Sequence, residues 1–387
     1  MTELAARPEI AASRFADRIA RAADSVTTQG LDAALVAVGP DLRYLTGYEA
    51  LPLERLTMLV IRPGPDGVHL VVPRLEADAA RAGSRTDVPI VTWEETDDPY
   101  RLVAGLTVGR DDRGARRVAV SDRLWASHLL RLQASLRGTA FQSAGPVLRD
   151  LRMIKDREEI ALLRLAAHAA DRVVAQIAAG RLIGRTEAEV SREVRDRLLA
   201  EGHELAEFAI VGSGPNSASP HHEASERVIQ AGEPIVLDIG GTLGGYGSDT
   251  TRTLWVTGGD PANGPHEAFR HLFGVLHAAH AAATRAVRPG VACEAIDAAA
   301  RDLIDAEGYG ENFFHRTGHG IGLEGHEDPY LVAGNDEPLR EGMAFSVEPG
   351  IYIPGRFGAR IEDIVVCGPD GPIVLNECAR ELYVVDG

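Results

Sequence analysis

The pattern of apolar and polar residues predicts strands that alternate with helices over the first part of the chain. Residues 8–28 have the periodicity of an amphipathic helix, and AALVAV (33–38) has the composition of a buried strand. TMLVIRPGPDGVHLVVP (57–73) has the pattern of two strands joined by a turn, and RRVAVSD (116–122) that of another strand before a helical stretch. This alternation predicts an α/β domain over residues 1–148.

Longer helical patterns follow. The segment 156–177 opens with Asp156 and Glu159 in the spacing of a capping box, and its apolar residues recur at helical intervals. A second helix is predicted over residues 186–202, where a glycine ends it. We therefore expect a second domain over residues 149–387.

The second domain contains a weak internal repeat. GRTEAEVSREVRDRLLAEG (184–202) aligns without gaps on GVACEAIDAAARDLIDAEG (290–308), and GEPIVLDIGG (232–241) falls on GMAFSVEPGI (342–351) after a four-residue insertion. Asp238 then stands opposite Glu348, and Asp249 and Glu362 follow in the next strand of each half. Chance similarity of two amphipathic helices is the alternative, but it does not explain the coincident carboxylates. We expect two helix-plus-hairpin halves that each deliver two carboxylates.

Composition narrows the possible partners. The chain has 57 acidic and 40 basic residues, a formal charge of −17, so its field repels nucleic acid and anionic membrane surfaces. Its three cysteines lack metal-finger spacing and are expected to be reduced thiols in a cytoplasmic protein. The charged N-terminal segment 1–25 has no apolar core, so no signal peptide is expected, and no apolar run approaches the roughly 20 residues that span a bilayer.

The four carboxylates interrupt apolar strands. Asp238 lies within IVLDI, where a buried charge is costly unless it is paired or bound to metal. The glycine-rich turn GGTLGGYGS can fold the strand back and set Asp249 beside Asp238. Two carboxylates at such a short distance repel each other, so a cation is expected between them. Each acid alone could be a strand-end or surface residue, but four acids in four apolar strands predict one common site.

Four carboxylates with one or two imidazoles suit two divalent cations that share a water molecule. This oxygen-rich set without sulfur favours Mn²⁺, Co²⁺, Fe²⁺ or Zn²⁺ in a hydrolytic role. The segment HRTGHGIGLEGHEDP (315–329) supplies the histidines. His319 is the candidate nitrogen ligand, because its flanking glycines would let the backbone approach the metals. His326 could reach a substrate.

Other polar residues near these motifs have weaker claims. His222 and His315 are expected to be structural loop residues. Thr251 and Thr253 could hydrogen-bond the ligand carboxylates, and Tyr246 is expected to pack in the core.

Together these motifs resemble a known family. The segments are DIGGTLGGYGSDTTRT (238–253), HRTGHGIGLEGHEDP, SVEPGIYIPG (346–355) and GARIED (358–363). They resemble the pita-bread metallopeptidases, and within them the proline-specific branch of prolidases and aminopeptidases P. GPDLRYLTGYE (39–49) and RDLRMIKDREEI (149–160) are similar to that branch's N-terminal domain and its junction. The resemblance implies an α+β fold with a pseudo-twofold C-terminal pita-bread domain and a smaller N-terminal α/β creatinase-like domain.

The resemblance also implies residue roles. It gives five metal ligands: Asp238, Asp249, His319, Glu348 and Glu362. Glu348 would also act as general base, while His221 and His326 would contact the substrate and stabilise the intermediate. Arg360 would lie near the metals and bind substrate.

The implied activity is hydrolysis of the Xaa–Pro bond at peptide N-termini, with two divalent ions per subunit, Mn²⁺ first among them, in a homodimer. An Xaa-Pro dipeptidase is preferred, and an aminopeptidase P that acts on longer peptides is the alternative. A metal-free creatinase-like hydrolase and a non-enzymatic binding protein are more remote, because the five-ligand set is intact.

Overall fold

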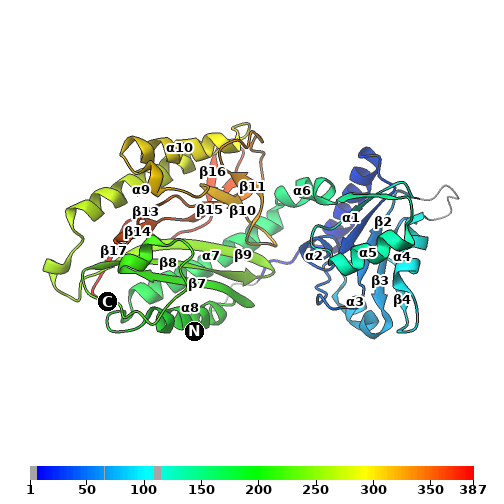
Figure 1. The fold of residues 1–387 in the computed structure, drawn as a ribbon, viewed down its shortest axis with the longest axis horizontal. Coiled ribbons are helices and arrows are strands. Elements are labelled where there is room, and N and C mark those ends of the chain that lie inside the picture. Colours follow the sequence, from blue (N-terminus) through cyan, green and yellow to red (C-terminus); the bar gives the residue numbers. More distant parts are fainter. Residues whose placement is uncertain (1–6, 65, 109–114) are drawn as a thin grey trace. The chain divides into compact units, whose positions relative to one another are not determined.

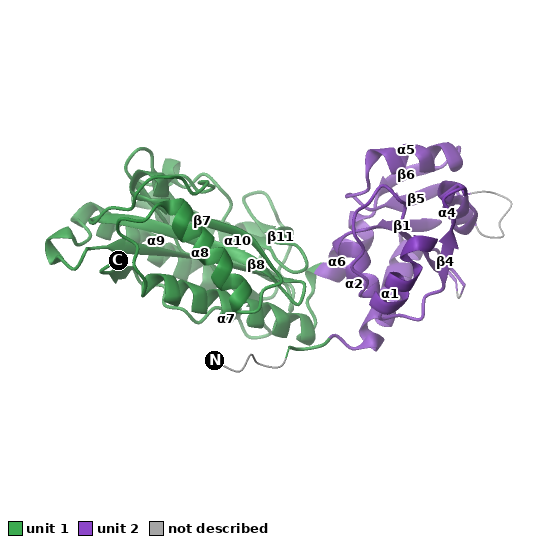
Figure 2. Ribbon diagram, turned by 90° about the horizontal axis from the view of Figure 1, so that it is seen from below, with its two compact units in different colours: residues 1–9, 153–387 green, residues 10–152 purple. Residues whose placement is uncertain are grey.

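The computed structural model in Figure 1 describes residues 7–64, 66–108 and 115–387. The chain forms two compact units, shown in Figure 2: unit 2 is residues 10–152, and unit 1 is residues 153–387 with the segment up to Glu9. The boundary predicted between residues 148 and 149 falls inside helix α6 (Gly145–Met153), and the units divide near the end of that helix. The first six residues of the charged N-terminal segment lie outside the described residues.

Unit 2 is built around a mixed sheet. In its described residues, six strands pair in the order β4-β3-β2-β1-β5-β6. The strands are β1 (Ala33–Ala37), β2 (Met58–Ile61), β3 (Val68–Pro73), β4 (Ile90–Trp93), β5 (Arg117–Val120) and β6 (Ala140–Ser143). The helices around them are α1 (Ala12–Thr28), α2 (Pro40–Thr46), α3 (Ala77–Gly83), α4 (Pro99–Val108), α5 (Ala126–Ser135) and α6. The predicted hairpin is confirmed, since β2 and β3 pair antiparallel.

Helix α2 begins and ends at residues that are typical of turns. Pro40 occupies its first position, where a fixed φ and a missing N–H are tolerated. Gly47 ends the helix with a φ of 77°, a left-handed conformation that favours glycine. The turn signals are therefore the two ends of a short helix.

Unit 1 has two main sheets between two pairs of helices (Figure 1). One sheet, ordered β17-β9-β8-β7, contains β7 (Leu205–Ser213), β8 (Glu233–Leu243), β9 (Tyr246–Val256) and β17 (Tyr383–Val385). The other, ordered β11-β10-β12-β15-β16, contains β10 (Gly318–Gly320), β11 (Glu327–Leu331), β12 (Ala344–Val347), β15 (Asp363–Cys367) and β16 (Pro372–Val374). A separate hairpin pairs β13 (Gly350–Ile353) with β14 (Phe357–Arg360).

Each sheet is covered by its own helix pair. Helices α7 (Arg157–Ala178) and α8 (Glu187–Ala200) pack apolar side chains such as Val174 and Val190 against Leu237 of β8. Helices α9 (Glu267–Ala286) and α10 (Cys293–Ala306) form a second core with β12 to β15. Capping boxes begin both α7 and α8, and the one at Asp156 was predicted from the sequence. The two halves of the repeat are thus two helix-plus-sheet layers.

The hairpin in the first half places two carboxylates on one face. Strands β8 and β9 turn at Gly244 and Gly245, whose φ angles of 67° and 79° favour glycine. The register sets Asp249 opposite Gly240, two residues from Asp238. Because side chains alternate along a strand, Asp238 and Asp249 point to the same side of the sheet.

The second half delivers its carboxylates where pairing is interrupted. Val347 pairs with Asp363, and Gly350 pairs with Arg360 in the next hairpin. Glu348 and Glu362 lie between these two ladders and share their register. They therefore stand opposite one another.

Candidate active site

The residues predicted from the sequence line one cavity of about 720 Å³. They are His221, Asp238, Asp249, His319, His326, Glu348, Arg360 and Glu362. The five predicted ligands come from β8, β9, β10 and the segments beside β12 and β15, so the cavity joins both halves of unit 1. The roles assigned to these residues remain predictions.

A compact group of ligand atoms lies inside this cavity. Asp249, His319 and Glu362 offer atoms that all lie within 4.8 Å of one another. Nε2 of His319 is 3.6 Å from Oδ2 of Asp249 and 3.3 Å from Oε1 of Glu348. Oδ1 of Asp238 is buried and has no hydrogen-bond partner in the described structure.

The electrostatics of the group fit a cation. Burial and the charge of Glu362 raise the pKa of Asp249 well above its usual range, and burial and Glu348 do the same for Glu362. Burial raises the pKa of Glu348 to about 7. Burial and His326 lower the pKa of His319 to about 3, which leaves a neutral imidazole able to bind a metal. Crowded carboxylates beside a neutral imidazole and an orphaned carboxylate oxygen suit divalent cations.

Hydrogen bonds fix the orientation of the predicted ligands in the second half of unit 1. The backbone N–H of His319 donates to Oγ of Ser346 over 3.1 Å, and that hydroxyl donates to Oε1 of Glu348 over 3.2 Å. Thr251 donates to Oε2 of Glu362 over 2.7 Å, as expected from the sequence. Thr253 instead donates to the carbonyl oxygen of Arg360.

Arg360 forms more hydrogen bonds with neighbouring residues than the sequence indicated. Its buried guanidinium pairs with Asp238 and donates to the hydroxyls of Tyr352 and Thr251 and to the carbonyl oxygen of Pro220. These bonds hold Asp238 at the wall of the cavity.

The two glycines beside His319 have neighbours other than those predicted. A Cβ on Gly318 would overlap the carbonyl oxygen of Ser346, and one on Gly320 would overlap that of Asp328. The glycines therefore let β10 lie close to the backbone on either side of it.

The histidines differ in exposure. His221 and His326 are exposed at the cavity, whereas His319 is buried. His315 also lines the cavity, but its Nε2 bonds the hydroxyl of Tyr352 over 3.0 Å and burial lowers its pKa to about 4. His222 bonds Glu187 instead and is absent from the cavity wall.

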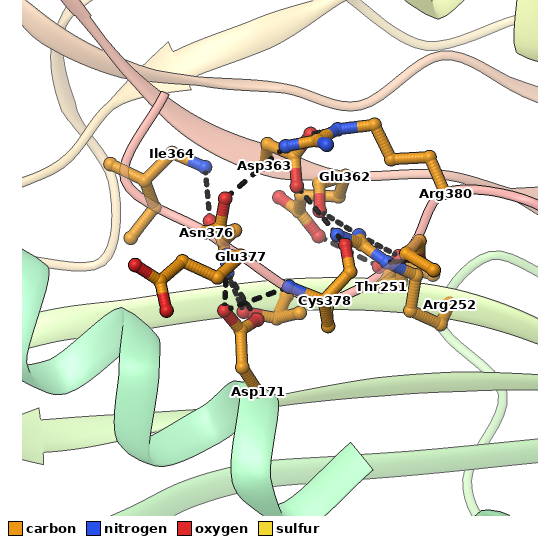
Figure 3. Close-up of polar contacts among 12 residues, drawn as sticks. Asp171, Thr251, Arg252, Glu362, Asp363, Ile364, Asn376, Glu377, Cys378 and Arg380 are labelled. Carbon is orange, nitrogen blue, oxygen red and sulfur yellow. Dashed lines mark hydrogen bonds and ion pairs between the residues drawn. The ribbon is translucent and has the colours of Figure 1, made fainter. Parts of the chain in front are cut away.

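The sequence did not predict a buried polar network that lies next to Thr251 and the predicted ligand Glu362 (Figure 3). Arg252 donates to the carbonyl oxygens of Thr251 and Glu362, over 2.9 and 2.6 Å, and to Oδ1 of Asp363 over 2.7 Å. Arg380 bonds the other oxygen of Asp363. Charged residues close to the predicted ligands, Arg252 three residues after Asp249 and Asp363 next to Glu362, were the available signal.

The segment after β16 completes this network. Asn376 accepts a hydrogen bond from the N–H of Ile364 over 2.8 Å and donates to Asp171 of α7 over 2.9 Å. Asp171 also accepts from the N–H groups of Glu377 and Cys378 (Figure 3). We call residues 376–380 the clamp segment, because it ties α7 to the strand after Glu362.

The cavity wall also contains residues that were not predicted from the sequence. Phe208, Ile210 and Phe314 give the cavity apolar surface. The guanidinium of Arg316 lies 4.4 Å from the ring centroid of Tyr330. No hydrogen bond or ion pair engages the guanidinium of Arg316 within the described ranges, so its charge is available to an anionic ligand.

Comparisons with known proteins cover nearly the whole chain. Residues 161–369 match the model of metallopeptidase family M24, and residues 18–154 match the creatinase/prolidase N-terminal domain. A "probable dipeptidase PepE" of Mycobacterium tuberculosis is 46% identical over 96% of both chains. An "Xaa-Pro dipeptidase" of Pyrococcus horikoshii is 31% identical over 95% of this chain and 98% of its own.

Solved structures give the same picture. The crystal structure of dipeptidase PepE from Mycobacterium ulcerans has a TM-score of 0.89 and 45% identity, over 97% of this chain and 99% of that one. These similarities confirm the α+β fold class with a creatinase-like N-terminal part and a pita-bread C-terminal part. No helix in the described part of the chain is long and apolar enough to cross a membrane.

Proposed function

Because the chain belongs to metallopeptidase family M24, we propose that this peptidase is an Xaa-Pro dipeptidase. The family resemblance drawn from the sequence is confirmed. Relatives named dipeptidase and Xaa-Pro dipeptidase along nearly the whole chain support the substrate class. The observation that carries the proposal is one cavity with a crowded carboxylate–imidazole group at one place and the unpaired guanidinium of Arg316 at another.

The proposed cofactor is a pair of divalent cations, with Mn²⁺ the first choice. The proposed ligands are Asp238, Asp249, His319, Glu348 and Glu362. Bound cations would lower the pKa of a water molecule and polarise the scissile carbonyl. Support comes from the fit of the donor set: oxygen-rich, without sulfur, and electrostatically unfavourable without a cation.

Proton transfer is assigned to Glu348. Its carboxylate borders the cavity, and Ser346 and His319 fix its Oε1. A carboxylate so placed can take a proton from the attacking water and return it to the leaving amine. When the Xaa–Pro bond breaks, the proline nitrogen, which carries no N–H in the peptide, takes up this proton and leaves as a secondary amine.

The exposed imidazoles of His221 and His326 are proposed to contact the substrate carbonyl. Both border the cavity beside the carboxylate group. Donors fixed in place stabilise the negative charge that develops on the carbonyl oxygen. Arg360 lines the same cavity, and its bonds to Asp238 and Thr251 support a role in holding the ligands as well as the predicted contact with substrate.

Arg316 is the proposed partner of the dipeptide's C-terminal carboxylate. A dipeptide carries this charge next to the scissile bond, whereas a longer peptide has a neutral amide there. A guanidinium suits a carboxylate because it offers paired donors. This feature favours the dipeptidase over the aminopeptidase P alternative.

The test compares Mn²⁺-loaded hydrolysis of Ala-Pro and Ala-Pro-Ala, with an EDTA-treated control. We expect metal-dependent cleavage of the dipeptide and little cleavage of the tripeptide. Strong cleavage of Ala-Pro-Ala would establish an aminopeptidase P instead, and hydrolysis that survives EDTA would overturn the metal assignment. Metal analysis of protein purified without added ions identifies the native metal.

A cytoplasmic homodimer completes the proposal. Three free cysteines, Cys293, Cys367 and Cys378, support a reducing compartment. The dimer rests on the family resemblance, and light scattering of the purified protein would test it.

A further inference from the structure

Glu187 is a buried carboxylate outside the cavity, and its hydrogen bonds converge on one loop. It is the first residue of α8 and has no solvent exposure. Four residues of the segment 213–225 donate to it: Ser213, Asn216, His222 and Ser225. The bonds from the hydroxyls of Ser213 and Ser225 measure 2.7 and 2.6 Å.

These bonds keep the carboxylate charged. Burial alone would raise its pKa, but hydrogen bonds from Ser225, Ser213 and His222 lower it to about 2. Bonds to an ionised acceptor are stronger than bonds between neutral groups. The loop is therefore attached to α8 at both of its ends, near Ser213 and near Ser225.

The middle of this loop reaches the cavity. His221 and Pro220 line it, and the carbonyl oxygen of Pro220 accepts a 3.3 Å hydrogen bond from Arg360. Ser217 accepts a bond from the N–H of Gly358 in β14 over 2.8 Å. His221 itself is exposed, so its position depends on the loop that carries it.

We propose that Glu187 is a positioning residue that holds the 213–225 loop, and with it His221, in the geometry needed for turnover. This inference rests on the proposed function of His221. Glu187 touches no part of the cavity, so it acts only through the loop.

The other half of unit 1 uses the same device with a different residue. Asp297 of α10 accepts bonds from the N–H and hydroxyl of Thr317, two residues before His319. The sequence repeat aligns Glu187 with Cys293 instead, so the alignment alone does not show the similarity. In each half, a carboxylate on the helix holds the segment that bears a site histidine.

The experiment uses Glu187→Gln with Glu193→Gln as the matched control. Glu193 lies on the same helix and pairs with Arg185 and Arg197, away from the loop. The NH2 group of the new side-chain amide would face the N–H and hydroxyl donors of the loop, and the corresponding hydrogen bonds would be lost. We expect kcat/KM for Ala-Pro to fall at least 10-fold in Glu187→Gln, mostly through kcat, with Mn²⁺ affinity by calorimetry within 2-fold of wild type. The control should keep wild-type kinetics.

A double-mutant cycle separates positioning from general destabilisation. If Glu187 acts through His221, Glu187→Gln should lower kcat/KM for Ala-Pro less than 2-fold in a His221→Ala background. Equal losses in both backgrounds would overturn the proposal.

Hydrogen exchange gives a readout independent of activity. Amides of residues 213–225 should exchange at least 10-fold faster in Glu187→Gln and unchanged in the control. Unchanged exchange rates would show that Glu187 does not hold the loop in place. If wild-type protein fails to cleave Ala-Pro, the proposed function falls, and the exchange data alone then decide whether Glu187 holds the loop.

Discussion

Thr251 and Glu362 are joined twice across the two halves of unit 1. The Thr251 hydroxyl donates to Oε2 of Glu362 over 2.7 Å, and the Glu362 N–H donates to the Thr251 carbonyl oxygen over 3.1 Å. The first bond orients a proposed ligand, and the second ties β9 to the segment before β15. Both ligand pairs of the proposed site therefore share one rigid junction.

Replacing Thr251 with valine should weaken metal binding while preserving the fold. The backbone bond remains, but Glu362 loses the donor that orients it. Loss of such an outer hydrogen bond typically costs about 10–100-fold in metal affinity. Calorimetric titration with Mn²⁺ measures this. Thr253→Val is the control, since its hydroxyl bonds a carbonyl oxygen instead of a ligand, and an equal loss there would contradict the prediction.

Replacing Arg252 with methionine should be strongly destabilising. Arg252 is fully buried against Asp363, and its loss leaves a buried charge with only part of its compensation. Breaking a buried pair in this way costs about 3–5 kcal/mol. Urea denaturation of the metal-free protein measures the change in the free energy of unfolding.

Arg380 provides the comparison for this measurement. Its side chain is 31% exposed and contacts the same carboxylate, so Arg380→Gln should cost clearly less than Arg252→Met. Equal losses would show that the two guanidinium groups are interchangeable.

The stability of the metal-free protein should fall in acid partly through Glu187. Its pKa in the folded state is about 2 against an ordinary 4.5. A depressed pKa stabilises the fold above pH 4.5, and this stabilisation is lost as pH falls toward 2. Between pH 6 and 3 wild type should lose roughly 2 kcal/mol more than Glu187→Gln. Denaturation curves at both pH values measure this difference, and parallel losses would contradict it.

Removing the charge of Arg316 should affect only substrates that end in a carboxylate. Arg316→Gln should raise KM for Ala-Pro about 10–100-fold, the range expected for a hydrogen bond to a charged group. Steady-state kinetics with Ala-Pro and its C-terminal amide measure the effect. The amide should be cleaved equally by both enzymes, and a matching rise in KM for the amide would assign Arg316 another role.

Local sequence signals predicted the elements that depend on neighbours in the chain. The capping box at Asp156 could be predicted because it uses residues only three positions apart. The β8–β9 hairpin formed because Gly244 and Gly245 permit its turn. Carboxylates in apolar strands predicted one cluster, because a buried charge needs a partner.

Features that depend on packing between distant segments were not predicted. Arg252 meets Asp363 and the clamp segment only after the two sheets come together. Arg316 gave no signal because its lack of a partner is a property of the folded cavity. The elements α3, β4 and β6 are short, and their sequences carry little periodicity, so no element was predicted there.

The clamp segment has a consequence for the order of assembly. Residues 376–380 follow every proposed ligand in the sequence, yet they support the backbone beside Glu362 and Ile364. During synthesis, the strands that carry all five proposed ligands leave the ribosome before this support exists. A nascent chain that has exposed Glu362 but not Asn376 therefore lacks the contacts that hold the strand after Glu362. Stable packing of β15 against α7 should then follow the emergence of the clamp segment.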